Sequence, residues 1–173
     1  MLNSNLNISG PMKNVTLLIA LIISLSSFGQ NHIENGNFER ELQNWNNLQG
    51  ENESYAQYTV ETRNTHKGYA MKVNVLRLGA NDWDIQSVVP VKIKLKKKKL
   101  YRLSFYGRTR TPGAAIRAVI QNQEYSAKDF TLTTSWNKYT WEFKTTEEVL
   151  DFKLHFFNKG TFYVDEVYLE RVK

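Results

Sequence analysis

The sequence contains no cysteine, only three prolines and only three histidines. Without cysteine the chain can form no disulfide, offers no thiolate nucleophile and has no sulfur to carry a lipid anchor. The histidines, His32, His66 and His155, lie far apart in the chain and show no spacing typical of a zinc site. The fold must therefore be stabilised by its hydrophobic core, alone or together with a bound ion.

Long apolar runs are also scarce, and the only one lies near the amino terminus. Lys13 precedes an apolar stretch over 15–25, and small residues follow it up to Gly29. This pattern predicts a signal peptide over residues 1–29, with Met12 as an alternative start. The run is shorter than the ~20 residues that a membrane-spanning helix needs, so we expect no membrane insertion. The protein is then secreted, periplasmic or held at the cell surface.

Positive charge is concentrated in one segment. The net charge is +6, yet six lysines fall within 91–99, and the rest of the chain after residue 29 is close to neutral. A protein that binds nucleic acid over its whole surface is therefore not expected. The lysine run over 92–99 is either a solvated turn beside a polar strand or a local patch that attracts an anionic polysaccharide or a cell surface.

From Gln30 onward the sequence shows no amphipathic helix and repeats short segments in which apolar and polar residues alternate. This period of two predicts strands, which we place at 54–62, 69–76, 84–95, 100–109, 114–121, 136–144, 149–158 and 161–172. Many strands without helices predict an all-β fold, namely a two-sheet β-sandwich of the jelly-roll type. Residues 30–173 would form this single domain.

The alternation also predicts which side chains face the core. Three inward rows are expected: Tyr101, Leu103 and Phe105; Tyr139, Trp141 and Phe143; and Phe152, Leu154 and Phe156. Trp136 is the first residue of the strand predicted at 136–144, and we expect it to have a structural role. The outward residues Tyr106, Arg108, His155 and Phe157 are then expected to lie on an outer sheet face, where polar and aromatic groups can hold a sugar chain.

Patterns typical of catalysis are few. No strand carries the Glu-x-Asp-x-x-Glu spacing that a laminarinase-type hydrolase needs on a jelly roll. Nucleophile elbows, phosphate-binding loops and zinc signatures are absent from the sequence as well. His155, Tyr106, Arg108 and Gln121 have the residue types of a polysaccharide lyase site, but residue types alone are weak evidence. We therefore expect a protein that is not an enzyme.

Two carboxylates at opposite ends of the domain are candidates for a metal site. Glu39 belongs to the segment NGNFE, and Asp165 belongs to YVDEVYLE. Terminal strands of a sandwich often pair, so these two side chains could meet and bind a hard cation through oxygen, with backbone carbonyls as further ligands. The alternative is that both are ordinary surface carboxylates near turns.

An ordered set of segments carries a family resemblance: NGNFE, HKGYAMKV, GANDWDIQ, LYRLSFYGRT, TTSWNKYTWEF and FYVDEVYLE. Together they resemble the carbohydrate-binding modules of families 4, 9 and 22, which have a galactose-binding-like jelly roll. The resemblance runs from about Asn31 to Val172, and WDIQ and VDEV are its most specific parts.

The resemblance implies a concave cleft that binds a single glycan chain, often xylan or β-glucan. It assigns Trp83 and Gln86 of the W-x-x-Q segment to that cleft, together with His155 on a late strand and Tyr125 in the loop after AVIQNQ. It also implies a structural calcium ion that is bound partly by Glu39 and Asp165.

These residue types suit a sugar for physical reasons. The indole of Trp83 offers a flat apolar surface on which the C–H face of a pyranose can stack with little loss of rotamer entropy. Gln86, Gln121 and His155 can both donate and accept hydrogen bonds, as sugar hydroxyls do. Arg108 could bridge two hydroxyls or bind a uronic acid.

We therefore predict a secreted β-sandwich that binds a polysaccharide or oligosaccharide without cleaving it. Its candidate ligand-binding residues are Trp83, Gln86, His155, Tyr106, Arg108, Gln121 and Tyr125. Modules of this kind usually accompany a catalytic domain, so a separate glycoside hydrolase is a candidate partner. Two alternatives remain open: a small polysaccharide lyase or hydrolase on the same fold, and an adhesion or envelope protein whose exposed Trp83 and Phe157 contact other proteins.

Overall fold

The computed structural model describes residues 30–121 and 125–172. Within these residues the chain forms two antiparallel sheets and one short 3-10 helix, η1 (Glu51–Glu53). The predicted all-β, two-sheet sandwich is confirmed. The predicted signal peptide, residues 1–29, lies outside the described residues. No helix in the described part of the chain is long and apolar enough to span a membrane.

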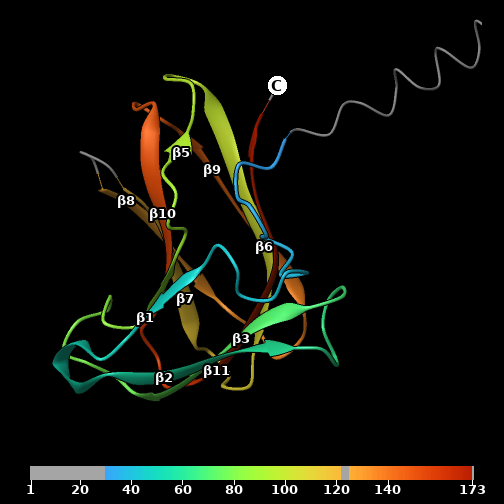
Figure 1. Cartoon of the computed structure of the whole chain (residues 1–173), viewed down its shortest axis with the longest axis vertical. Helices are drawn as coiled ribbons and strands as arrows, with labels where there is room; N and C mark the ends of the chain where they lie inside the picture. Colours follow the sequence, from blue (N-terminus) through green and yellow to red (C-terminus); the bar gives the residue numbers. More distant parts are fainter. Residues whose placement is uncertain (1–29, 122–124, 173) are drawn as a thin grey trace, which may run out of the picture.

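One sheet has six strands and carries the candidate site. Its order is β1-β4-β10-β7-β8, and β5 pairs with β10 beside this path (Figure 1). The strands are β1 (Asn46–Leu48), β4 (Gln86–Val88), β5 (Ile93–Lys94), β7 (Ala115–Gln121), β8 (Tyr125–Thr131) and β10 (Val149–Phe156). Strands β10 and β7 therefore lie at the centre of this sheet, with β8 at one edge.

The other sheet has five strands in the order β2-β3-β11-β6-β9. Its strands are β2 (Tyr55–Glu61), β3 (Ala70–Arg77), β6 (Leu100–Thr109), β9 (Asn137–Lys144) and β11 (Gly160–Arg171). Strand β11 forms its centre. The first described residues at the amino terminus lie beside β11 (Figure 1).

The predicted strands are found, with three differences: β1 was not predicted, and the other two concern the segment 84–95 and β8. The segment 84–95 divides into β4 and β5 at Pro90, because proline has no N–H to donate to a neighbouring strand. Strand β8 was expected to be part of a loop. Of its seven residues only Phe130 is buried, so the sequence of this edge strand shows no apolar alternation.

The core lies between the two sheets, and the inward rows of two strands are as predicted. Those rows, Tyr101, Leu103 and Phe105 on β6 and Phe152, Leu154 and Phe156 on β10, are almost completely buried. The row on β9, formed by Tyr139, Trp141 and Phe143, packs against this core but is only partly buried. Strand β9 is an edge strand, which leaves this row partly open to solvent.

The two ends of the domain lie side by side. The amide of His32 donates to the carbonyl of Leu169 at 2.9 Å, and the amide of Val167 donates to the carbonyl of Gly36 at 2.8 Å. A side chain at Gly36 would collide with the Val167 carbonyl, so this close approach requires glycine. The expected meeting of the segments that contain Glu39 and Asp165 is thus observed.

A β-bulge interrupts the pairing of β11 with β6 between Asp165 and Tyr168. Glu166, at the bulge, has a left-handed backbone with φ of 49°. Val164 and Val167 both belong to the core although they are three residues apart, because the bulge adds one residue between them. Asp165 is therefore turned to the outside of the sheet.

Candidate functional site

A hollow of about 470 Å³ lies on the outer face of the six-stranded sheet. We call this hollow the cleft. Its lining residues come from four strands and the loop before β4: Trp83, Gln86, Arg117, Gln121, Tyr125, Lys153 and His155. Five of the seven candidate ligand-binding residues, namely Trp83, Gln86, Gln121, Tyr125 and His155, are thus brought together.

Strand pairing places the polar side chains of the cleft next to one another. Gln86 of β4 pairs with His155 of β10, and His155 pairs on its other side with Arg117 of β7. Arg117 in turn pairs with Asp129 of β8. A row of hydrogen-bonding groups therefore crosses the sheet from β4 to β8.

A second part of the cleft lies two residues further along the strands. Here Lys153 of β10 pairs with Val119 of β7, and Gln121 at the end of β7 pairs with Tyr125 of β8. Val119 is fully buried, yet it is not part of the core between the sheets. It alternates with the inward Ala118 and Ile120, so it points outward and is covered by neighbouring side chains.

Trp83 and Gln86 are joined by a hydrogen bond. The side-chain amide nitrogen of Gln86 donates to the backbone carbonyl of Trp83 at 2.9 Å. This bond leaves Oε1 of Gln86 buried and without a partner among the described residues. The indole of Trp83 is 55% exposed, which is unusual for so large an apolar side chain. The pair therefore presents an aromatic surface and a vacant hydrogen-bond acceptor.

Asp84 holds the turn that carries Trp83. Its carboxylate accepts hydrogen bonds from the amide of Asn81 at 2.8 Å and from the side chain of Asn52 at 3.0 Å. Burial opposes ionisation of Asp84, but these hydrogen bonds prevail and lower the pKa of its carboxyl group. A side chain at Gly79 would collide with this carboxylate. Asp84 thus shapes the turn.

Arg117 fixes one wall of the cleft. Its guanidinium donates two hydrogen bonds to Asp129, at 2.6 and 3.0 Å, and one to Asp82 at 2.9 Å. The hydrogen bond to Asp129 is the main reason why the pKa of Arg117 is raised. Its guanidinium also lies 5.0 Å from the centre of the Phe157 ring. The carboxylates of Asp82 and Asp129 therefore compensate the charge of Arg117. Through these ion pairs Arg117 on β7 connects the loop that carries Trp83 to β8.

His155 is only 4% exposed, and both of its ring nitrogens are buried without a partner among the described residues. Burial is the main cause that lowers its pKa to about 4, and the positive charges of Lys153 and Arg117 lower it further. The imidazole is therefore neutral at pH 7. In that form one ring nitrogen can donate a hydrogen bond and the other can accept one.

Tyr106 and Arg108 do not line the cleft. Both are on β6 of the five-stranded sheet, whereas His155 and Phe157 belong to β10 and the residue after it in the other sheet. The prediction that these four side chains share one outer face is wrong. Alternation along a strand shows whether a side chain points inward or outward, but it does not show to which sheet the strand belongs.

Tyr106 and Arg108 instead support a loop on the outside of the five-stranded sheet. The Arg108 guanidinium lies 3.9 Å from the centre of the Tyr163 ring and 5.3 Å from that of Trp136. Tyr106 stacks on His66, with ring centres 3.5 Å apart. Since Gln121 and His155 lie on the opposite sheet, these residues do not form the lyase site that their residue types allowed.

The carboxylates of Glu39 and Asp165 hold the same loop between β2 and β3. Asp165 is fully buried and accepts a hydrogen bond from the amide of Lys67 at 2.9 Å. Glu39 accepts one from the amide of Tyr69 at 3.1 Å. Burial is the main cause that raises the pKa of Asp165 to about 7, and the charge of Glu39 is one of the additional causes. The two carboxylates therefore lie close enough to repel each other.

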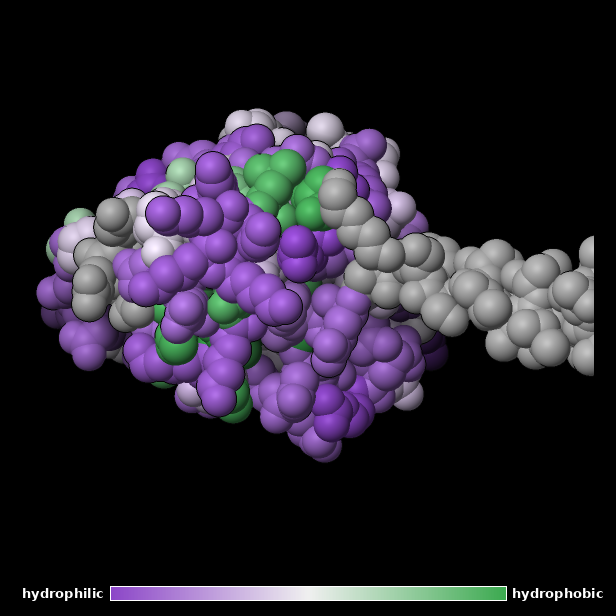
Figure 2. Space-filling model, turned by 90° about the horizontal axis from the view of Figure 1, so that it is seen from above, coloured by the Kyte–Doolittle hydropathy of each residue, from purple (hydrophilic) through white to green (hydrophobic). Residues whose placement is uncertain are grey.

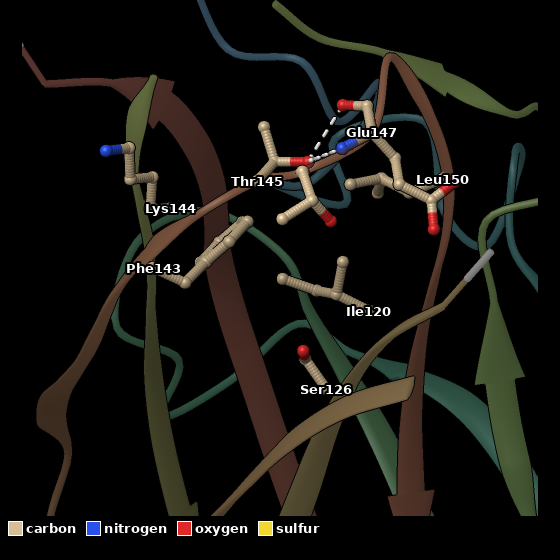
Figure 3. A pocket seen from close by; sticks show the side chains of 8 residues that line it. Ile120, Ser126, Phe143, Lys144, Thr145, Glu147 and Leu150 are labelled. Carbon is tan, nitrogen blue, oxygen red and sulfur yellow. Dashed lines mark hydrogen bonds between the residues drawn. The ribbon is translucent and has the colours of Figure 1, made fainter. Parts of the chain in front are cut away.

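A smaller hollow, of about 50 Å³, lies where β9 leads into β10 (Figure 3). Ile120, Phe143 and Leu150 contribute apolar surface to it, and the Thr145 hydroxyl donates to the carbonyl of Glu147 at 2.8 Å. This volume holds a few water molecules at most, so it is too small for a sugar ring.

The lysine run lies in β5 and the loop from β5 to β6, at the top of Figure 1. Figure 2, which shows this end of the molecule, has a mostly hydrophilic surface with several separate hydrophobic patches. A hollow of about 300 Å³ here is lined in part by Lys94, Lys96 and Arg171. Tyr101 contributes to the same hollow, which is separate from the cleft.

Comparison with known families gives a match over most of the chain. Residues 30–161 match the model of the family CBM_4_9, which is described as a carbohydrate binding domain. A comparison with curated proteins gives no match.

Several solved structures share the fold. A structure described as "CBM4 structure and function" is 21% identical, with a TM-score of 0.66, and the alignment covers 81% of this chain and 99% of that one. The CBM22-1 xylan-binding domain of Xyn10C from Paenibacillus barcinonensis is 13% identical, with a TM-score of 0.57 and coverage of 84% and 94%. The family 11 carbohydrate-binding module from Clostridium thermocellum, in complex with a β-1,3-1,4-mixed-linked tetrasaccharide, is 17% identical, with a TM-score of 0.55 and coverage of 78% and 92%.

Proposed function

The chain belongs to the carbohydrate binding domain family CBM_4_9, and from that premise we propose that its cleft binds a single polysaccharide chain of the xylan or β-glucan class without cleaving it. Two of the similar structures are described as a xylan-binding domain and as a complex with a mixed-linked β-glucan fragment, which supports this ligand class.

The observation that carries the proposal is the set of vacant hydrogen-bonding atoms in the cleft. Oε1 of Gln86 and both ring nitrogens of His155 are buried without partners among the described residues. A buried polar atom without a partner costs about 1–3 kcal/mol, so these atoms favour a ligand or water that can donate and accept. Sugar hydroxyls do both.

The aromatic residues of the cleft support the same ligand. Trp83 is 55% exposed and Tyr125 is 56% exposed, and they lie beside β4 and on β8, respectively. The three strand spacings from β4 to β8 cover about 14 Å, which exceeds the width of one sugar ring. Stacking of pyranose rings on these two side chains would hold several successive sugars across the strands.

The lining of the cleft favours binding over hydrolysis. A glycoside hydrolase requires two carboxyl groups on either side of the scissile bond. The described residues that line the cleft include no carboxylate. We propose that the protein acts outside the cytoplasm, in keeping with the predicted signal peptide, and that it holds a polysaccharide for a separate glycoside hydrolase.

We also propose a structural calcium ion at Glu39 and Asp165. A buried carboxylate with a raised pKa beside a second carboxylate is an unfavourable arrangement unless a cation compensates the charge. Oxygen is the ligand atom that calcium prefers. No group of three or more Asp, Glu or His side chains suited to a metal occurs among the described residues, so backbone carbonyls would supply further ligands.

Native gels that contain xylan or mixed-linked β-glucan test the function. The wild type should be retarded, and Trp83→Ala should lower the affinity about tenfold or more, because an exposed stacking surface is lost. Tyr168→Ala, which removes an aromatic residue that is 37% exposed on β11, should leave retardation unchanged. If neither polymer retards the wild type, the proposed ligand class is wrong. Release of sugar products from either polymer would contradict binding without cleavage.

A further inference from the structure

Lys153 lies at the centre of the cleft. Its neighbours on β4 and β7 are Val88 and Val119, so it lies between two apolar side chains. The side chain is half-buried, and its Nζ donates to Oε1 of Gln121 at 3.2 Å. An ammonium group has three donors, and this hydrogen bond to a neutral amide uses one of them.

The other charges around the cleft are already compensated. Arg117, the second cation of the lining, is paired with Asp82 and Asp129. Asp151, the outward carboxylate on β10 two residues before Lys153, is paired with Lys92 at 3.3 Å. Among the cleft-lining residues that the structure describes, Lys153 is the cation that forms no ion pair.

The charge of Lys153 lies close to the imidazole of His155, whose ring nitrogens are buried without partners among the described residues. After burial, it is the next cause that lowers the pKa of His155, which shows that its field reaches the imidazole. His155 and Lys153 are two residues apart on β10, so their side chains lie on the same face. A negatively charged group bound there would contact Lys153 and could accept a hydrogen bond from the neutral imidazole.

We infer that the cleft prefers a polysaccharide that carries carboxylate groups, and that Lys153 determines this specificity by binding the carboxylate of a uronic acid. This inference rests on the proposed function and adds the charge of the bound glycan as a determinant of specificity in the same cleft. A hydrogen bond between an ammonium group and a carboxylate is about twice as strong as one between neutral groups. A half-buried lysine without an ion pair therefore gains more from an acidic sugar than from a neutral one.

The carboxylate can belong to a side branch or to the main chain of the polysaccharide. Glucuronoxylan represents the first source and polygalacturonate the second. Each polymer can be compared with its carboxyl-reduced form, in which the uronic acids have become neutral sugars and the rest of the chain is unchanged. This pair of ligands isolates the contribution of the charge.

The experiment measures the affinity of the wild type for both polymers and for their reduced forms. We expect at least one acidic polymer to bind about tenfold more tightly than its reduced form at low salt, and this preference to decrease at high salt. Lys153→Gln should abolish the preference, and Lys153→Arg, which keeps the charge, should retain most of it. Lys96→Gln removes the same charge from the separate basic hollow and should change nothing.

Two results would overturn the inference and leave the proposed function intact: equal affinity for the acidic and reduced polymers, or a preference that persists in Lys153→Gln. A preference lost in Lys96→Gln but not in Lys153→Gln would assign the effect to the lysine run, which also overturns it. If the wild type binds neither the acidic polymers nor their reduced forms, nor the neutral xylan and β-glucan, the proposed function fails as well. Thermal melting of each variant verifies that the fold persists.

Discussion

Gln86 donates its amide nitrogen to the carbonyl of Trp83, and this one hydrogen bond decides what the side chain offers to a ligand. The nitrogen is engaged, and the carbonyl oxygen of the side chain is buried and lacks a partner among the described residues. At the residue scale, the W-x-x-Q spacing thus has a physical meaning. The tryptophan supplies both the stacking surface and the acceptor that orients the glutamine.

His155 should make the stability of the protein depend on pH. Its pKa is about 4 in the folded state and near 6.5 in an unfolded chain, because burial disfavours the charged form. As the pH falls from 6.5 to 4, the unfolded state binds this proton and the folded state does not. The titration of His155 alone should therefore lower the free energy of unfolding by about 3 kcal/mol between pH 7 and pH 4, while the raised pKa of Asp165 acts in the opposite direction over the same range.

Urea unfolding at a series of pH values measures this loss. The part that belongs to His155 is the difference in free energy of unfolding between the wild type and His155→Gln, which should change by about 3 kcal/mol from pH 7 to pH 4, whereas the difference between the wild type and His66→Gln, which replaces an exposed histidine, should not. A decrease of the same size in His155→Gln would show that other groups cause it.

The residues of the site could be predicted only in part. The resemblance placed Trp83, Gln86, His155 and Tyr125 in one cleft, and the structure brings them together with Gln121. Lys153 and Arg117 were not predicted as cleft residues. Lysine and arginine are common at outward positions, and only the pairing of β7 with β10 shows that these two face the same hollow.

At the scale of elements, the two faces of β10 have different roles: one contributes to stability and the other to binding. Phe152, Leu154 and Phe156 face the core, whereas Lys153 and His155 face the cleft. Phe152→Ala should lower the free energy of unfolding by roughly 3–5 kcal/mol, because it leaves a cavity in a fully buried position. Lys153→Gln should change the free energy of unfolding by no more than about 0.5 kcal/mol.

Urea unfolding and gel retardation of both variants verify this separation. The folded fraction of Phe152→Ala should still bind polysaccharide. A loss of binding by Phe152→Ala at a temperature where it is folded would mean that the core residue also shapes the cleft, in contradiction to the separation of the two faces.

The elements that the sequence predicts well are those with one buried and one exposed face. Strand β6 has the predicted bounds, 100–109, and Tyr101, Leu103 and Phe105 give it a clear apolar inward row. Strand β8 was missed because an edge strand exposed on both sides needs no apolar alternation. The pairing of strands could not be predicted either, since strands that are distant in sequence, such as β7 and β10, become neighbours.

At the scale of the whole molecule, Glu39 and Asp165 connect the two ends of the domain through the loop between β2 and β3. If a calcium ion binds there, its removal should loosen all three segments together. A chelator should therefore lower the melting temperature by several degrees, because bound calcium at 100 times its dissociation constant stabilises the folded state by about 2.7 kcal/mol.

Differential scanning calorimetry with calcium and with chelator measures this shift. Asp165→Asn should remove the sensitivity to chelator. Glu170→Gln, which changes a carboxylate on the same strand that pairs with Arg102, should retain it. An unchanged melting temperature of the wild type in chelator would rule out the calcium site.

The edge strands of the sandwich have a consequence for the protein at high concentration. An open edge offers unpaired backbone groups to the strand of another molecule, which is a common beginning of aggregation. Here β1 has only three residues, β8 carries Lys128 and Asp129, and β9 carries Lys138, Glu142 and Lys144. Charges along β8 and β9 and the short length of β1 oppose the addition of a strand from another molecule at these three edges, whereas β2, the fourth edge, has seven residues and carries only Glu61 as a charge.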